Sequence, residues 1–156
     1  MARGQNRPTT PDQRIRDLRK EFRAFDGEEP GPDRAARLAV FVRAAHEERQ
    51  LNMVMHAATL CLEDDPDAPD LLVDAYLAVG RDAEERLHAL DDLRDLARYV
   101  DRDDIAAIAD EHLRREARAW VMDGDDAERR HRLRRVQSLV SQEVADAIRD
   151  ELELPT

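Results

Sequence analysis

Two pairs of the form Glu-x-x-His are the residues whose types and spacing could bind metal ions. Glu85 and His88 lie in one segment with helical periodicity, and Glu128 and His131 lie in another, as in the di-iron sites of four-helix bundles. Ligands of such a site must point into the bundle. At about 100° per residue, however, His88 and His131 lie roughly 150° and 180° from the centres of their helices' apolar faces. The spacing therefore predicts no metal site, and the sequence indicates no cofactor.

His112 and Glu116 are the second candidate pair, because they lie one helical turn apart on an apolar face. Burying this pair costs free energy unless each group finds a hydrogen-bonding partner. We interpret it as a buried structural interaction, and a small-molecule or metal enzyme built around the pair is the third alternative for the function. His56 is likewise predicted to be a buried polar residue. No residue is predicted to be catalytic, so we expect a protein that is not an enzyme.

The charged residues are unevenly distributed along the chain. Residues 1–23 carry seven basic and three acidic side chains, whereas residues 63–113 carry 17 acidic side chains and five arginines, in a chain of net charge −11. A basic segment on an acidic chain indicates docking on the chain itself or binding to a partner. The net charge opposes general attraction to nucleic acid or anionic lipid.

A second basic region, residues 114–135, contains eight arginines and five acidic residues. These arginines are scattered around the expected helix instead of forming one stripe. The pattern favours ion pairs with the acidic middle of the chain over a phosphate-binding surface.

The composition predicts an all-α protein. Charged residues make up 39% of the chain and aromatic residues 4%, and no long stretch alternates apolar with polar side chains. Connections of two to seven residues indicate mostly antiparallel neighbours, arranged as stacked helical hairpins or as an irregular bundle. We expect about seven helices, at residues 10–25, 33–48, 50–64, 68–79, 82–100, 103–122 and 125–153.

Helix ends are marked by capping residues. Thr10, Asp82 and Asp125 each precede a periodic segment and have Gln or Glu three positions later. Gly80 and Gly124 follow periodic segments and indicate helix ends.

One segment, LNMVMHAATLCL at 51–62, is apolar on nearly every side. A helix of this kind is typical of a protein interior. We therefore expect a buried central helix around Met55, against which the amphipathic helices pack.

The domain organisation follows from these patterns. Residues 1–9 are predicted to be a disordered basic arm, residues 10–25 a basic amphipathic helix, and residues 33–153 one all-helical domain. Cys61 is the only cysteine, which suits the cytoplasm, and no segment is long and apolar enough to span a membrane.

Part of the chain resembles the tetratricopeptide repeat family. The stretch from Leu60 to Pro66 is similar to the end of the second helix of that repeat, and Ala75-Tyr76 followed by Gly80 is similar to its first helix. The resemblance covers residues 35–100. It implies stacked helical hairpins that bind a protein or peptide on a concave face, and a generic helical bundle accounts for the same residues.

The leading hypothesis is a non-enzymatic adaptor or regulatory module that binds another protein. The first helix is the candidate docking element, through the residues Arg14, Ile15, Leu18, Arg19, Phe22 and Phe25. The runner-up is a nucleic-acid-associated regulator that uses the basic arm and the region 114–135. A homodimer, in which the basic segment of one chain meets the acidic body of another, is a further interpretation.

Overall fold

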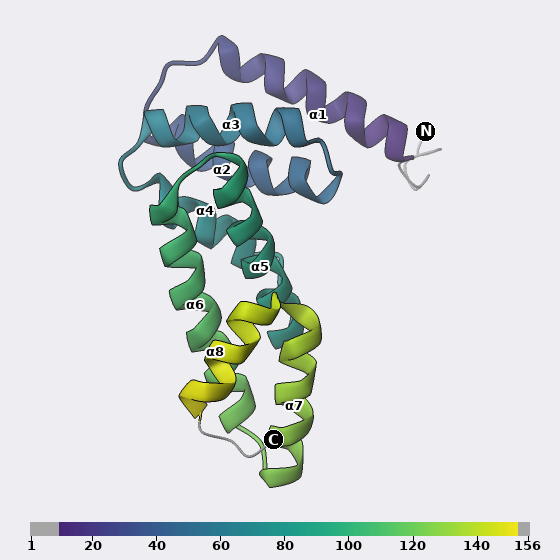
Figure 1. Cartoon of the computed structure of the whole chain (residues 1–156). Coiled ribbons are helices and arrows are strands. Elements are labelled where there is room, and N and C mark those ends of the chain that lie inside the picture. Colours follow the sequence, from purple (N-terminus) through teal and green to yellow (C-terminus); the bar gives the residue numbers. More distant parts are fainter. Residues whose placement is uncertain (1–9, 153–156) are drawn as a thin grey trace. The chain divides into compact units, whose positions relative to one another are not determined.

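The computed structural model describes residues 10–152, which form eight α-helices and no strand (Figure 1). The expected all-α fold is confirmed. The described residues divide into two compact units, unit 1 up to Ala68 and unit 2 from Pro69 onward. The helices are α1 Pro11–Asp26, α2 Pro32–Glu47, α3 Leu51–Asp64, α4 Ala68–Leu77, α5 Ala83–Tyr99, α6 Asp103–Met122, α7 Asp126–Leu139 and α8 Gln142–Leu152.

The predicted helix starts are confirmed. Thr10 Oγ1 accepts a hydrogen bond from the backbone N–H of Gln13, with Pro11 in the first turn of α1. Asp82 caps α5 in the same way, and Asp125 and Glu128 form a reciprocal capping box at the start of α7. These caps satisfy N–H groups that have no partner within the helix. The predicted arm at residues 1–9 lies outside the described residues, and the separation of residues 10–25 from a domain at 33–153 stays a prediction.

Unit 1 is built from three helices that alternate in direction. Cys61 lies 3.3 Å from the carbonyl oxygen of Ala35, so the end of α3 meets the start of α2. α1 runs alongside α3 in the same direction, because the pairs Arg14–Glu48 and Phe22–His56 are both separated by 34 residues. α1 is therefore an integral helix of unit 1 that packs against both α2 and α3.

The predicted burial of α3 on all sides is not confirmed. Its neighbours within unit 1 are α1 and α2, which cover one face. Leu51 and Met55 are 39% and 37% exposed, and His56 is exposed as well. The buried face consists of the smaller residues Val54, Ala57, Ala58 and Cys61. Small side chains at this spacing let two helices approach closely.

Three phenylalanines fix α1 against α2. The ring of Phe22 stacks on Phe41 with centroids 5.6 Å apart, and Phe25 meets Phe41 edge to face at 5.7 Å. Both geometries are favourable for aromatic pairs. The apolar stripe of α1 is thus used inside unit 1.

Arg34 connects all three helices of unit 1. Its guanidinium group binds both carboxylate oxygens of Asp64 at the end of α3, at 2.6 and 2.8 Å. It also donates to the carbonyl oxygens of Phe25, in the last turn of α1, and of Glu28, just after that helix. The side chains of Arg34 and Asp64 are only 8% and 2% exposed. This network therefore fixes the end of α1 relative to α2 and α3.

In unit 2, the helices α5, α6 and α7 also alternate in direction. α5 packs against α6, and both helices contribute buried residues: leucines from α5, and Ile105, Leu113 and small residues from α6. Arg94 lies 2.5 Å from Asp110 across this pair of helices. Arg135 of α7 binds Glu84 at 2.7 Å near the start of α5, and this ion pair holds the pKa of Glu84 below its usual value.

The last predicted helix is divided, which corrects the expectation of seven helices with one running from 125 to 153. α7 ends at Leu139, Val140 is extended, and α8 begins at Gln142. The backbone N–H of Ser141 donates to Asp91 of α5 instead of continuing the helix. Arg94 donates to the hydroxyl group of Ser141, so the break is anchored on α5 twice.

We predict that Asp64→Asn destabilises unit 1 strongly. The substitution leaves the buried guanidinium group of Arg34 without a counter-charge, which costs about 3–5 kcal/mol in comparable sites. Chemical denaturation followed by circular dichroism measures the effect. Glu48→Gln is the control, because it breaks the more exposed Arg14–Glu48 pair and should cost about 0–1 kcal/mol. Equal losses for both variants would contradict the importance assigned to Arg34.

We also predict a pH-dependent effect of Asp91→Asn. Burial raises the pKa of Asp91, so the folded chain holds this proton more tightly than the unfolded chain does. The wild type should therefore lose stability relative to the variant as pH rises from acid to neutral. The variant keeps an acceptor for the N–H of Ser141. Unfolding measured over this pH range tests the sign, and Asp95→Asn, an exposed carboxyl group on the same helix, should not reproduce the effect.

Candidate functional site

The candidate partner-binding residues of α1 lie on two different faces. Leu18 and Phe25 are buried, and Ile15 and Phe22 are half-buried. Leu18 and Phe25 are buried because α1 packs against α2 and α3 there, and docking of a partner through this apolar face stays a prediction. Only the outer face of α1 remains accessible within unit 1.

The two arginines in the candidate set differ in the same way. Arg14 binds Glu48 at 2.7 Å and so contributes to the packing of α1. Arg19 is exposed on the outer face. Arg19 belongs to a group of four cations on this face, and the sequence analysis named only Arg19 among them as a candidate.

Four cationic side chains form what we call the α1 stripe: Arg16, Arg19, Lys20 and Arg23. Their spacing of i, i+3, i+4 and i+7 puts them on one face of the helix. All four are exposed, and none forms an ion pair with a carboxylate of the described residues. Arg16 donates one hydrogen bond to the neutral side chain of Gln13.

Most other cations in the described part of the chain are ion-paired. The exceptions outside α1 are Arg49, Arg114, and the two residues Arg130 and Arg134, which lie one helical turn apart on α7. The α1 stripe is thus a local concentration of uncompensated positive charge. Asp12 lies one turn before Arg16, and Asp26 lies three residues after Arg23, but neither pairs with the stripe.

The stripe is electrostatically unfavourable for the isolated helix. It contains four like-charged contacts at i, i+3 or i, i+4, each worth about 0.2–0.5 kcal/mol of repulsion. The repulsive sum is about 1–2 kcal/mol, and attraction from Asp12, Asp17 and Asp26 at the same spacings offsets part of it. An arrangement of like charges that costs stability, and whose one described side-chain hydrogen bond is that from Arg16 to Gln13, is typical of a binding surface.

The second basic region, residues 114–135, is largely used in internal contacts. Arg115 binds Glu111, Arg135 binds Glu84, and Arg118 pairs with Glu151. Arg132 donates to the carbonyl oxygen of Trp120 at 2.7 Å and to Glu128 at 3.1 Å. These pairs include two with the acidic segment 63–113, as the scattered pattern had indicated.

The polar candidates His56, His112 and Glu116 are not brought together. His56 is exposed and not buried as expected, and its ring lies 6.3 Å from that of Phe22. His112 and Glu116 are half-buried on α6. Glu116 forms an ion pair with Arg86 at 3.1 Å, so its charge is already balanced within unit 2.

The Glu-x-x-His residues have structural roles at helix ends or on the surface. Glu85 accepts from the backbone N–H of Arg81, and Glu128 belongs to the capping box of α7. His88 and His131 are exposed. Within residues 10–152, no group of three or more His, Cys, Asp or Glu side chains is arranged to hold a metal ion.

Cys61 is buried at the contact between α3 and α2. Its thiol is hydrogen-bonded to the carbonyl oxygen of Ala35. Burial, together with the nearby charges of Asp64 and Asp65, raises the pKa of Cys61 to about 12. The thiolate form that nucleophilic or redox chemistry requires is therefore scarce.

No protein-family model, curated protein or solved structure matches this chain. The resemblance to tetratricopeptide repeats over residues 35–100 therefore stays a prediction. None of the helices in the described segment is both long enough and apolar enough to cross a bilayer.

We predict that Cys61 resists alkylation while the protein is folded. At a pKa of about 12, the thiolate fraction near pH 8 is about 10⁻⁴, and the side chain is enclosed. Iodoacetamide at mildly alkaline pH should leave the native protein unmodified by mass spectrometry. The same reagent in guanidinium chloride is the control and should label it fully. Rapid labelling of the native protein would show that α2 and α3 separate readily.

Proposed function

We propose that this protein is a non-enzymatic helical module that binds an acidic protein through the outer face of α1. The single observation that carries the proposal is the α1 stripe, four exposed cations on one helix face that have no carboxylate partner among residues 10–152. We also propose that the protein is located in the cytoplasm, because the one cysteine of the chain is a buried free thiol.

The packing of α1 supports this proposal. The aromatic contacts of Phe22 and Phe25 and the hydrogen bonds of Arg34 hold the helix in one position within unit 1. A surface that is already ordered loses little conformational entropy when a partner binds. The stripe spans about 10 Å along the helix, which suits the acidic face of one partner helix or an acidic loop.

A protein partner is favoured over a nucleic acid by the charges around the stripe. Asp12, Glu21 and Asp26 also lie on α1, so the positive surface is short and bounded by carboxylates. Most arginines of 114–135 are engaged in ion pairs. Four cations alone release few counterions, and strong binding to DNA or RNA needs more phosphate contacts. The resemblance to tetratricopeptide repeats points to the same class of partner.

We predict that neutralising the stripe removes partner binding without destabilising the fold. The test protein carries Arg16→Gln, Arg19→Gln, Lys20→Gln and Arg23→Gln. Its melting temperature should be unchanged or slightly higher, because like-charge repulsion is relieved. Affinity capture from native lysate, quantified by mass spectrometry, should lose the acidic proteins that the wild type retains.

A second quadruple variant is the matched control. It carries the same substitution at Arg49, Arg114, Arg130 and Arg134, so both variants change the net charge equally, from −11 to −15. Only the α1 variant should lose the captured proteins. Identical capture by both variants would disprove the proposal. Stripe-dependent binding to labelled duplex DNA, with no acidic protein retained, would favour the nucleic-acid alternative instead.

A further inference from the structure

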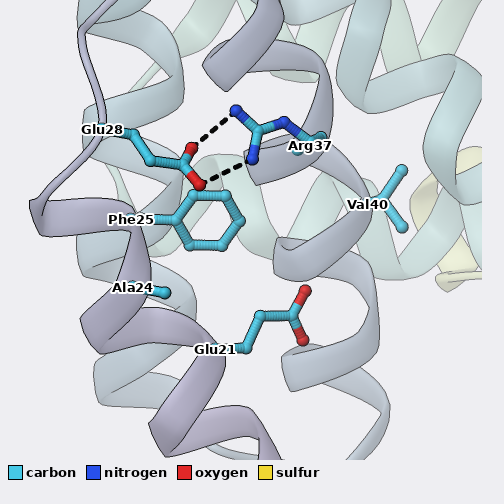
Figure 2. A pocket seen from close by; sticks show the side chains of 6 residues that line it. All are labelled: Glu21, Ala24, Phe25, Glu28, Arg37 and Val40. Carbon is cyan, nitrogen blue, oxygen red and sulfur yellow. Dashed lines mark hydrogen bonds and ion pairs between the residues drawn. The ribbon is translucent and has the colours of Figure 1, made fainter.

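A groove opens between α1 and α2 in unit 1, and we call it the α1/α2 groove. Figure 2 shows its lining: Glu21, Ala24, Phe25, Glu28, Arg37 and Val40. The ring of Phe25 faces the groove from α1, and Val40 stands on α2. Glu28 and Arg37 are joined by an ion pair at one end, and Glu21 lies toward the other end.

The end formed by Glu28 and Arg37 is nearly neutral, because the two charges pair with each other. The two groups are 2.6 Å apart, and the hydrogen bond with Arg37 holds the pKa of Glu28 below its usual value. The guanidinium carbon of Arg37 also lies 5.8 Å from the centroid of the Phe25 ring. The charges of Glu28 and Arg37 therefore balance each other, and the apolar surface beside them is left open.

The groove is too small for most cofactors but large enough for a side chain. Its volume is about 230 Å³, below the roughly 300–1,000 Å³ of typical small-molecule sites. Val40 is 61% exposed, the highest exposure among the large apolar side chains of the described residues. Filling the groove with one apolar side chain would remove that surface from water.

The groove and the α1 stripe adjoin on α1. Ala24, which lines the groove, follows Lys20 by one helical turn, and Lys20 follows Arg16 by one turn. These three residues form one ridge on the helix surface. An extended or helical segment could thus place one side chain in the groove while its neighbours lie over the stripe.

We propose that the α1/α2 groove binds a large apolar side chain of an acidic peptide segment whose carboxylates pair with the α1 stripe. This inference rests on the proposed function and adds a second, apolar element to the same site. Charge complementarity identifies the occupant, because the face of α1 next to the groove carries four exposed cations that pair with no carboxylate of the described segment 10–152. Apolar anchors at the centre and charges at the rim are the usual division of roles in interfaces.

Glu21 provides an internal check on this geometry. It is exposed at the groove and forms no ion pair in the described structure. A carboxylate at this position repels an acidic segment that enters the groove, so Glu21→Gln should strengthen binding severalfold. A basic segment would respond in the opposite direction.

The experiment begins with selection of random peptides of about 12 residues, displayed on phage, against the full-length protein. Enriched peptides should combine Asp and Glu with one Phe, Leu, Ile or Met. The best peptide is then synthesised with a fluorophore and titrated by fluorescence anisotropy. Val40→Gln and Ala24→Gln should each weaken its binding about tenfold. Both positions are exposed, so these substitutions should not disturb the fold.

Met55→Gln is the matched control. It changes a partly exposed apolar residue of the same unit that does not line the groove, and it should leave peptide affinity unchanged. A peptide in which the apolar residue is replaced by Ser should bind as weakly to the wild type as the original peptide binds to Val40→Gln.

The other outcomes separate this inference from the proposed function. If neutralising the stripe abolishes peptide binding but Val40→Gln and Ala24→Gln do not weaken it, the groove inference is wrong and the proposed function stands. If neither set of variants weakens binding, both fail. Enrichment of basic or uncharged peptides, or no enrichment, overturns the groove inference. So does a homodimer, detected by sedimentation, that Val40→Gln dissociates.

Discussion

The position of α1 depends on the buried guanidinium group of Arg34. This group binds both carboxylate oxygens of Asp64 and two carbonyl oxygens at the end of α1. A buried ion pair does not by itself stabilise a fold more than well-packed apolar residues would, because both charges must be desolvated. Its geometry is specific, however, since a planar donor group meets fixed acceptors at the end of α3 and at the end of α1. We therefore regard Arg34 as the residue that selects one orientation of α1.

That orientation divides α1 into an inner and an outer surface. Leu18 and Phe25 point into unit 1 and the stripe points out, so the same helix contributes to the core and presents the charge. The shape of the groove depends on the same constraint, because Phe25 and Glu28, whose carbonyl groups Arg34 binds, line it together with Arg37 of α2. A change at Arg34 should thus reach the proposed site although Arg34 does not line it.

Helix starts could be predicted from the sequence because they depend on local contacts. Thr10, Asp82 and Asp125 bind N–H groups within four residues of themselves, so the signal and the interaction occupy the same short segment. The break between α7 and α8 has only a weak local signal, Ser141 directly before α8. Val136, Val140, Val144 and Ile148 recur every four residues across it, and the periodicity of one continuous helix is preserved.

The burial of α3 was overestimated for a related reason. Hydrophobicity shows which side chains favour burial but not how many neighbours a helix has. With α1 and α2 as its neighbours in unit 1, α3 buries its smaller residues and leaves Met55 partly exposed. The ion pair of Asp64 could not be predicted from the sequence either, because its partner Arg34 lies 30 residues away. In the sequence Asp64 reads as part of a helix end.

For the candidate site, the positions of the cations on the helix could be predicted from the sequence, but their ion pairing could not. The spacing of Arg16, Arg19, Lys20 and Arg23 is visible in the sequence, and it places them on one face. Whether those cations are compensated depends on carboxylates that folding brings near, as it does for Arg14 through Glu48. Only the fold distinguishes a stripe that is free from one that is paired.

A chain of net charge −11 can still attract an acidic partner through a surface of this kind. At physiological ionic strength the Debye length is about 8 Å, so exposed charges farther away contribute little at contact. The sign of the nearest group then decides the interaction, and over the α1 stripe that sign is positive.

Complementary charge mainly raises the rate of association and selects the partner, whereas apolar burial mainly slows dissociation. With a groove beside a charged stripe, the charges would therefore speed association and the buried apolar side chain would slow dissociation. Added salt should weaken binding chiefly by slowing association, while substitutions at Val40 should act chiefly by speeding dissociation.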